Sequence, residues 1–282
     1  MKREPPKPAG GPAKPRPAFP ARMNTTPDTP QRLHAAQAQR VTPAPKAPVS
    51  NTKVPVSPMT HRVHTSGVGM DSQAIRFTMV QKIQAQGMQD PRVAEALRSV
   101  ERHRFVDSAL VPQAYEDTSL PIGLGQTISK PSVVARMMAL LCEGRTGKLG
   151  RVMEIGTGCG YQAALLSHIA KEVYSIERLR GLHDKARENL RHLRLPNVHL
   201  ILGDGMLGFP SGAPYSAIIS AAGGLSIPQA WLDQLAVGGR LVAPSESPSG
   251  QQHLVVIDKT ETGCVQTVLE PVLFVPLKSG VL

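Results

Sequence analysis

Residues 152–170 read VMEIGTGCGYQAALLSHIA. An apolar run ends at Glu154-Ile155, glycines occupy positions 156, 158 and 160, and an apolar pattern at helical spacing starts at Tyr161. Glycines in such a turn adopt backbone angles that other residues rarely adopt, and they let a ligand approach the main chain closely. The stretch therefore predicts a strand, a ligand-binding turn and a helix.

Short β-rich runs surround this turn and alternate with helices or turns, and a plain helix is predicted from Arg180 to Leu193. Strands that alternate with helices are typical of a mostly parallel, twisted sheet with helices on both faces. We therefore predict an α/β, Rossmann-like fold. The predicted strands are RVMEI (151–155), EVYSIE (172–177), NVHLIL (197–202), YSAIIS (215–220) and GRLVAPS (239–245).

The two ends of the folded part differ from its middle. Apolar residues at helical spacing from Ser72 to Gln86, and a second helix start at Asp90-Pro91, predict a helical N-terminal portion. HLVVID (253–258) and TVLEPVLFVPL (267–277) follow each other closely, which predicts a terminal hairpin and hence an antiparallel edge.

The 282-residue chain is 41% hydrophobic and carries a net charge of +11, but its charge is unevenly spread. Residues 1–70 hold eleven Lys or Arg, two acids and fourteen of the 26 prolines. A segment without periodic apolar residues does not recover its ordering entropy, so we predict a disordered basic arm over 1–70 and a folded domain over 71–282. The arm has two open interpretations: weak contact with nucleic acid or another polyanion, or a solvated tail upstream of a true start at Met59 or Met70.

Three cysteines at positions 142, 159 and 264 match neither a disulfide framework nor a zinc pattern, so a reducing cytoplasm and no metal are expected. The longest uncharged stretch is interrupted by prolines, and no membrane segment is predicted.

Two acidic residues follow the next two predicted strands. Glu177 closes EVYSIE, and Asp204-Gly205 follows NVHLIL. Each alone is better explained by a surface ion pair or a plain turn than by a binding site. Ligands of open parallel sheets bind at the carboxyl ends of strands, where an acid can accept hydrogen bonds from the ribose hydroxyls of a nucleoside. The joint placement therefore predicts one nucleoside site, with Glu177 at the ribose and Asp204 receiving an adenine amino group.

The stretch GQTISKP (125–131) leads into an apolar helix predicted from about Pro131 to Cys142. Ser129 precedes Pro131, as a helix N-cap does. The free N–H groups at a helix start also favour a bound carboxylate. We therefore predict that Ser129 caps the helix, at a place that is also favourable for an incoming carboxylate.

With these residues in place, the chain resembles the protein-L-isoaspartate O-methyltransferase family of S-adenosylmethionine-dependent enzymes from about Ile75 onward. The stretch GQTIS ahead of the glycine motif is the specific part. The matching blocks are RFVD (104–107), LPIGLGQTISKPSVVARM (120–137), VMEIGTGCGYQAALL (152–166), YSIERLRGL (174–182), GDG (203–205), IP (227–228) and FVPL (274–277).

The resemblance implies a class I methyltransferase fold, a monomeric state, and methyl transfer to the α-carboxyl of L-isoaspartyl or the β-carboxyl of D-aspartyl residues in damaged proteins. Its active-site serine maps onto Ser129, which we therefore predict to orient the substrate carboxylate. Its cofactor contacts map onto Glu154, Gly156, Gly158 and Gly160 at the methionine end, Glu177 at the ribose, and Asp204 with Gly205 at the adenine, while Gln126, Thr127 and Ile128 line the same loop.

Three positions depart from the family pattern. Ser132 stands where an aromatic residue or histidine is usual, Ser216 where aspartate is typical, and Ser220-Ala221 where a Val-Thr pair is common. These departures concern the substrate side more than the cofactor side.

Other functions remain as alternatives. A class I methyltransferase acting on a small-molecule carboxylate or RNA shares the cofactor half but not GQTIS. An NAD-dependent oxidoreductase is disfavoured by the G-x-G-x-G spacing. A noncatalytic nucleic-acid-binding module leaves the glycines and acids unexplained.

Overall fold

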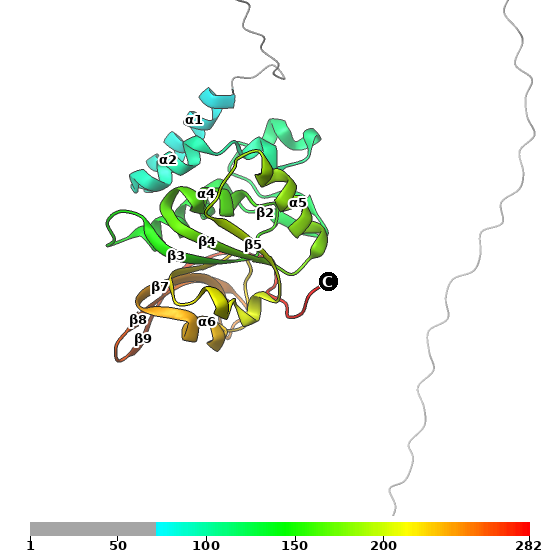
Figure 1. Cartoon of the computed structure of the whole chain (residues 1–282). Helices are drawn as coiled ribbons and strands as arrows, with labels where there is room; N and C mark the ends of the chain where they lie inside the picture. Colours follow the sequence, from blue (N-terminus) through cyan, green and yellow to red (C-terminus); the bar gives the residue numbers. More distant parts are fainter. Residues whose placement is uncertain (1–71) are drawn as a thin grey trace, which may run out of the picture. The chain divides into compact units, whose positions relative to one another are not determined.

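The computed structural model describes residues 72–282 (Figure 1). The predictions for the arm, residues 1–70, lie outside the described residues. Among the described residues, no helix is long and apolar enough to cross a membrane.

Seven strands of the described chain form one sheet in the order β5-β4-β3-β6-β7-β8-β9. The five strands from β5 to β7 are parallel, and β8 runs antiparallel to both of its neighbours. The predicted mostly parallel sheet with an antiparallel C-terminal edge is confirmed. The strands are β3 (Leu149–Ile155), β4 (Ala170–Glu177), β5 (Val198–Leu202), β6 (Tyr215–Ser220), β7 (Leu235–Glu246), β8 (Gln252–Thr260) and β9 (Gly263–Pro271).

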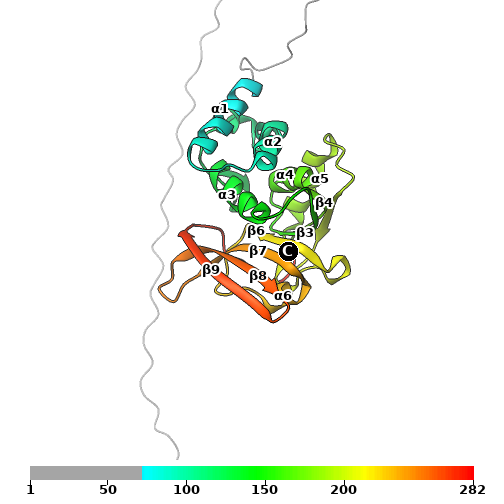
Figure 2. The ribbon, with the colours of Figure 1, turned by 90° about the vertical axis from the view of Figure 1, so that its left-hand side faces the viewer.

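Helices cover both faces of the sheet, but unevenly (Figures 1 and 2). The central strands read as nearly continuous apolar runs because they are buried on both sides. One face of the sheet packs against the helical N-terminal portion and against the helices that follow β3 and β4. The other face packs against a single short helix, which carries the buried Trp231. The helices are α1 (Ser72–Ala85), α2 (Pro91–Ser99), α3 (Pro131–Cys142), α4 (Tyr161–Ile169) and α5 (Arg180–Arg191) on the first face, and α6 (Gln229–Gln234) on the second.

The terminal hairpin forms, but its second strand was placed wrongly by the sequence pattern. β9 begins at Gly263, because a two-residue turn suffices after β8, and it ends at Pro271. Val272–Leu277 therefore leaves the sheet. The segment instead pairs with Gly223, which donates to Val275 O and accepts from Leu277 N. This turn away from the hairpin carries the C-terminal residues toward the carboxyl ends of the parallel strands.

The order of the strands sets the position of the site. The chain moves outward from β3 through β4 to β5, and then crosses to the other side of β3 to form β6 and β7. At such a switch point the connections diverge and leave a crevice at the carboxyl ends of the strands. The turn after β3 lies in that crevice.

Candidate active site

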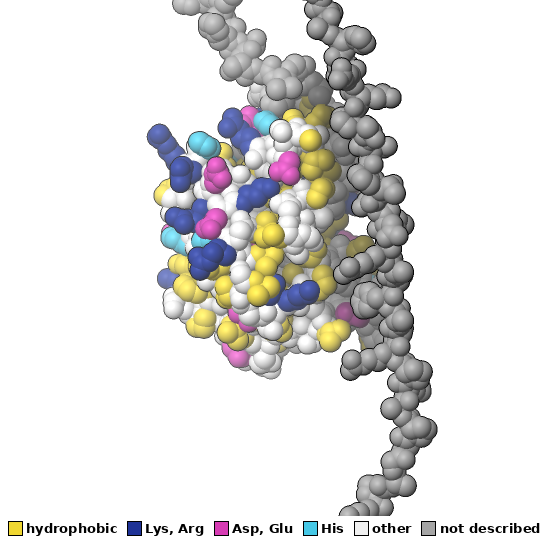
Figure 3. Space-filling view, turned by 90° about the vertical axis from the view of Figure 1, so that its right-hand side faces the viewer, with side chains coloured by type: hydrophobic (Ala, Val, Ile, Leu, Met, Phe, Trp, Pro, Cys, Tyr) yellow, Lys and Arg dark blue, Asp and Glu magenta, His cyan; other side chains and the backbone are white. Residues whose placement is uncertain are grey.

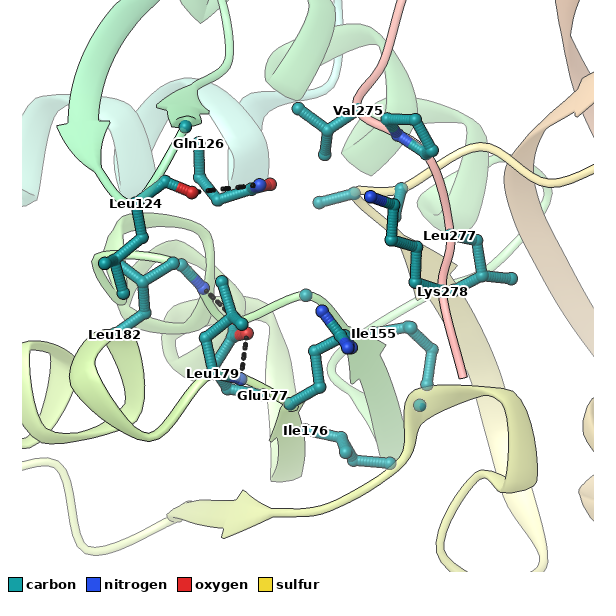
Figure 4. Close-up of a pocket in the computed structure, with 18 of the residues that line it drawn as sticks. Leu124, Gln126, Ile155, Ile176, Glu177, Leu179, Leu182, Val275, Leu277 and Lys278 are labelled. Carbon is teal, nitrogen blue, oxygen red and sulfur yellow. Dashed lines mark hydrogen bonds between the residues drawn. The ribbon is translucent and has the colours of Figure 1, made fainter. Parts of the chain in front are cut away.

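A cavity of about 480 Å³ opens at the carboxyl ends of β3 and β4 (Figure 4). Ile155 and Ile176, the apolar ends of the two strands, contribute to its floor. In Figure 4, Leu124 and Gln126 stand on one side, and Val275, Leu277 and Lys278 stand on the other. The cavity thus combines three segments that are far apart in sequence.

The glycine turn shapes the cavity with its backbone. Gly156 donates to Ile176 O at 2.9 Å, which ties the turn to the end of β4. Gly158 has a φ of +57°, and its N–H donates to Glu177 Oε2 at 2.9 Å. A Cβ at Gly158 would lie 3.2 Å from the Ile122 side chain and would be strained by the positive φ. Gly156 and Gly158 both line the cavity, where the sequence places cofactor contacts.

Gly160 has a different role. It precedes α4 with a φ of +91°, and a Cβ there would lie 3.2 Å from the Leu190 side chain on α5. The residue does not line the cavity. In the structure Gly160 therefore allows two helices to pack closely, and its predicted contact with the cofactor stays a prediction.

Glu177 is the acid best placed for a ligand. Its carboxylate lines the cavity, is only 5% exposed, and accepts from Leu179 N and Gly158 N, both at 2.9 Å (Figure 4). Two backbone donors fix the orientation of the carboxylate. Since each oxygen can accept more than one hydrogen bond, capacity remains for ligand hydroxyls.

Gly205 lines the cavity beside Ile155, whereas the neighbouring Asp204 does not. A Cβ at Gly205 would lie 2.6 Å from Ile155 Cγ2, so this position requires glycine. Asp204 Oδ1 accepts from Met206 N at 2.9 Å, and Oδ2 accepts from Gly280 N at 2.7 Å. The carboxylate of Asp204, which the sequence predicts to bind the adenine amino group, is thus hydrogen-bonded to the C-terminal segment.

The sequence pattern gave no indication that the C-terminal segment forms a wall of the site. Arg178 Nε donates to Gly280 O at 3.1 Å. Leu282 N donates to Arg178 O at 2.8 Å, and Leu282 O accepts from Arg180 N at 2.7 Å. Each of these contacts has a main-chain group of the C-terminal segment as one partner, which any residue type supplies, so composition and periodicity carry no signal for them.

The predicted loop before α3 is a β-hairpin. β1 (Leu120–Gly123) pairs with β2 (Gln126–Ile128) across a turn in which Leu124 and Gly125 have φ values of +51° and +69°. Lys185 Nζ on α5 donates to Ile122 O at 3.0 Å and anchors the hairpin beside the cavity. Gln126 and Thr127 line the cavity, whereas Ile128 is buried in the core, and the predicted contacts of these residues with the cofactor stay predictions.

A second cavity, of about 420 Å³, contains Ser129. It shares Thr127, Ala221 and Val275 with the first cavity, so the two spaces adjoin. Ser129 is half-buried, and no side-chain hydrogen bond within residues 72–282 uses its hydroxyl. The hydroxyl is therefore available to a ligand that enters the second cavity.

The prediction that Ser129 caps α3 is wrong. The N-cap is Lys130, which makes no side-chain cap. Because Pro131 has no N–H, the first donor of the helix belongs to Ser132. Asp117 serves it: Oδ1 accepts from Ser132 N at 2.9 Å, and Oδ2 accepts from Ser132 Oγ at 2.7 Å. Asp117 was missed by the sequence analysis because it lies 15 positions upstream of its partner.

Glu154 lies behind the glycine turn and does not line the cavity. It is fully buried, accepts from Ser175 Oγ at 2.5 Å through Oε2, and has no partner for Oε1 among the described residues. Burial raises the pKa of Glu154 to about 8. Its predicted contact with the methionine end of the cofactor stays a prediction.

The other positions that depart from the family pattern lie in different places relative to the two cavities. Ser216 Oγ donates to Arg151 O at 3.0 Å and lines neither cavity. Ser220 Oγ donates to Ala222 O at 2.8 Å. Ala221 lines both cavities, so among these positions it is the one placed to influence substrate contact.

The chemistry of the first cavity fits a nucleoside cofactor. Apolar strand ends supply surfaces for a base, glycines without side chains let a ligand approach the main chain, and Glu177 supplies a fixed carboxylate for hydroxyls. Among residues 72–282, no three His, Cys, Asp or Glu side chains gather in a way that would hold a metal ion.

Comparison with known proteins agrees with this arrangement. A sequence model of the Protein-L-isoaspartate(D-aspartate) O-methyltransferase (PCMT) family matches residues 75–282. The chain is 54% identical over 262 residues to the protein-L-isoaspartate O-methyltransferase of Leptothrix cholodnii, with 91% of each chain covered. It is 58% identical over 218 residues to the protein of that name from Methylibium petroleiphilum, with 76% of this chain and 81% of the relative covered.

Solved structures show the same likeness. A protein-L-isoaspartate O-methyltransferase structure aligns with a TM-score of 0.66 at 28% identity, covering 73% of this chain and 67% of the other. A Plasmodium falciparum structure attributed to the same activity, in complex with S-adenosyl-L-homocysteine, aligns with a TM-score of 0.64 at 24% identity, covering 72% and 98%; it supports the fold alone. The family match and the two relatives establish that the chain belongs to the protein-L-isoaspartate(D-aspartate) O-methyltransferase family.

Proposed function

We propose that the protein is an S-adenosylmethionine-dependent protein-L-isoaspartate O-methyltransferase, which methylates the α-carboxyl of L-isoaspartyl residues, or the β-carboxyl of D-aspartyl residues, in damaged proteins. The observation that carries the proposal is the pair of adjoining cavities. One presents Glu177 and the glycine turn, and the other presents the unpaired hydroxyl of Ser129. Thr127, which lines both, marks where the two reactants meet.

S-adenosylmethionine supplies an electrophilic methyl group on a sulfonium. In the proposed arrangement, Gly156 and Gly158 face the methionine end, with Glu154 behind them, and Glu177 accepts from the ribose hydroxyls. Gly205 faces the adenine edge, and contact of the neighbouring Asp204 with the adenine stays a prediction, because Asp204 does not line the cavity. The fixed orientation of the Glu177 carboxylate and the exact fit of Gly205 against Ile155 support these roles.

The substrate carboxylate needs no general base. With an ordinary pKa of roughly 3 to 4, it is ionised at neutral pH and is itself the nucleophile. The protein must hold the carboxylate in line with the methyl group and keep water out, which contributes up to roughly 7–11 kcal/mol in favourable cases. We assign the holding to Ser129, which donates a hydrogen bond to the carboxylate. Thr127 and Gln126 shape the passage between the cavities.

The methyl ester formed in this way closes to a succinimide without further catalysis, and hydrolysis of the succinimide returns part of the damaged residue to aspartate. The proposed role is therefore protein repair.

One assay tests the function. Labelled S-adenosylmethionine is offered with two matched peptides, one with isoaspartate and one with aspartate at the same position. Base-labile label on the isoaspartyl peptide alone is the expected result. Equal labelling of both peptides, or of neither, contradicts the proposal; label on RNA or a small carboxylate would favour the alternative methyltransferase.

A monomeric state, a cytoplasmic location and weak polyanion contact by the arm stay predictions. On the face of the described chain that Figure 3 shows, lysine and arginine side chains are interspersed with acidic and apolar ones and form no continuous basic band.

A further inference from the structure

Arg102 is a buried cation beneath the loop that carries Ser129. It lies in the 3-10 turn η1 (Arg102–Phe105), and its side chain is fully buried. Its Nε donates to Ala114 O at 2.8 Å, and its Nη2 donates to Ser129 O at 2.8 Å and to Thr118 O at 3.4 Å. A single guanidinium therefore hydrogen-bonds to main-chain oxygens on both sides of the β1–β2 hairpin, before it at Ala114 and Thr118 and after it at Ser129.

The same guanidinium contacts the cofactor side. Its central carbon lies 4.9 Å from the centre of the Tyr161 ring. Tyr161 is the first residue of α4 and directly follows the glycine turn. Arg102 thus links the loop of the second cavity to the turn that shapes the first one, and the rigidity of its planar fork fixes their relative position.

No carboxylate among residues 72–282 forms an ion pair with Arg102, and its Nη1 is buried without an acceptor. The buried Arg76 nearby is different, since it pairs with Glu101 at 3.6 Å. Burying an uncompensated charge is unfavourable, and apolar groups of similar volume often replace buried ions without loss of stability. Stability alone therefore gives little reason for a cation at position 102.

We propose that Arg102 is a positioning residue for methyl transfer: it acts through the Ser129 backbone to hold the loop against the glycine turn, and its charge favours an anionic acceptor in the second cavity. The inference rests on the proposed function. Arg102 takes no proton and touches neither reactant, because arginine stays protonated and its hydrogen bonds go to main-chain oxygens.

The test compares Arg102→Lys, Arg102→Met and the matched control Arg76→Met, which removes a buried arginine that does not reach the loop. For each variant we would measure kcat and KM with an isoaspartyl peptide, the Kd of S-adenosylhomocysteine by calorimetry, and Tm. A general loss of packing lowers Tm in both Met variants. A positioning role changes the kinetic constants only at position 102.

We expect Arg102→Met to lower kcat about 30- to 100-fold and raise the peptide KM about fivefold or more, with the Kd of S-adenosylhomocysteine within about twofold of wild type. Arg102→Lys keeps the charge but lacks the planar fork that reaches the carbonyls from two nitrogens, so kcat should fall about tenfold with KM near wild type. Arg76→Met should leave kcat and KM within about twofold.

Equal kinetic effects at positions 76 and 102 would overturn the inference, as would an Arg102→Met variant that loses affinity for S-adenosylhomocysteine as much as it loses kcat. If Arg102→Met does not fold, Arg102→Lys decides, and wild-type kcat in that variant overturns the inference. A wild-type enzyme that does not label the isoaspartyl peptide would instead overturn the proposed function.

Discussion

At the scale of single residues, Glu154 and Glu177 show how position decides the role of an acid. Glu177 is the last residue of β4 and Glu154 the last but one of the parallel neighbour β3, and both are buried. Glu177 accepts two backbone N–H groups, while Glu154 accepts one hydroxyl and has no partner for its other oxygen among the described residues. Glu177 faces the cavity and Glu154 lies behind it. Only the first is therefore free to bind a ligand without moving.

Glu154→Gln should change how stability depends on pH. Because the folded-state pKa of Glu154, about 8, lies above its ordinary value, the folded protein binds more protons than the unfolded chain between these values. This group therefore destabilises the fold progressively as pH rises from 5 to 8, by up to about 1.4 kcal/mol per pH unit. The glutamine variant lacks this loss.

Urea denaturation at pH 5, 6, 7 and 8 checks this prediction. The free energy of unfolding of Glu154→Gln, relative to wild type, should rise with pH. The exposed Glu188→Gln serves as the control and should follow wild type. A Glu154→Gln curve parallel to that of wild type would show that Glu154 is ionised in the folded protein.

Ser129→Ala should lower kcat for the isoaspartyl peptide about 10- to 100-fold and leave the affinity for S-adenosylmethionine within about threefold, because the hydroxyl lines the second cavity and not the first. Steady-state kinetics and calorimetry separate the two effects. Ser216→Ala, which changes a hydroxyl far from both cavities, is the matched control. Equal loss of turnover and cofactor affinity would exclude the orienting role.

At the scale of elements, the sequence pattern assigned both the cap of α3 and the substrate contact to Ser129, but another residue supplies the cap. Pro131 sets the first helical turn, and Asp117 caps it from the preceding segment. Ser129 is left outside the helix, with its carbonyl held by Arg102. A hydroxyl without a structural partner can turn to a ligand at no cost to the helix.

Asp117→Ala should destabilise the fold by about 1–2 kcal/mol, the usual effect of losing an N-cap. Ser132→Ala removes only one of the two hydrogen bonds to Asp117 and should have a smaller effect. Chemical denaturation of both variants measures the difference. If Ser132→Ala costs as much as Asp117→Ala, the backbone bond from Ser132 N contributes nothing to the cap.

At the scale of the whole molecule, the site depends on the C-terminal segment returning across the sheet. Val275 to Lys278 and Leu282 line the first cavity, and Gly280 N is held by Asp204. The segment reaches this place because β9 ends at Pro271 and the chain then pairs with Gly223.

Deletion of residues 279–282 should weaken binding of S-adenosylhomocysteine by about tenfold, which corresponds to about 1.4 kcal/mol, because Leu282 is lost from the cavity lining and Gly280 no longer ties the segment to Asp204. Calorimetry measures the change. Val281→Ala, at a partly exposed position outside the lining, should bind normally. Unchanged or tighter binding by the deleted protein would mean that the segment does not contribute to the site.

Removal of residues 1–70 should abolish any binding to DNA, since these residues carry most of the net charge. For the full chain, binding should weaken steeply between about 50 and 200 mM salt, as expected when lysines and arginines displace counterions. Titration of both proteins with DNA at several salt concentrations provides the comparison. Equal binding by the two proteins would place the contact in residues 71–282.

The sequence by itself determined the alternation of strands and helices, the glycine turn and Glu177, because periodicity and local turn chemistry are properties of neighbouring residues. It also determined the family through motifs such as GQTIS. Only the tertiary structure decided that Asp117, rather than Ser129, caps α3, that Arg102 holds the loop, and that the C-terminal segment walls the cavity. These contacts join distant segments, and several of them end on main-chain atoms, which leave no trace in the order of side chains.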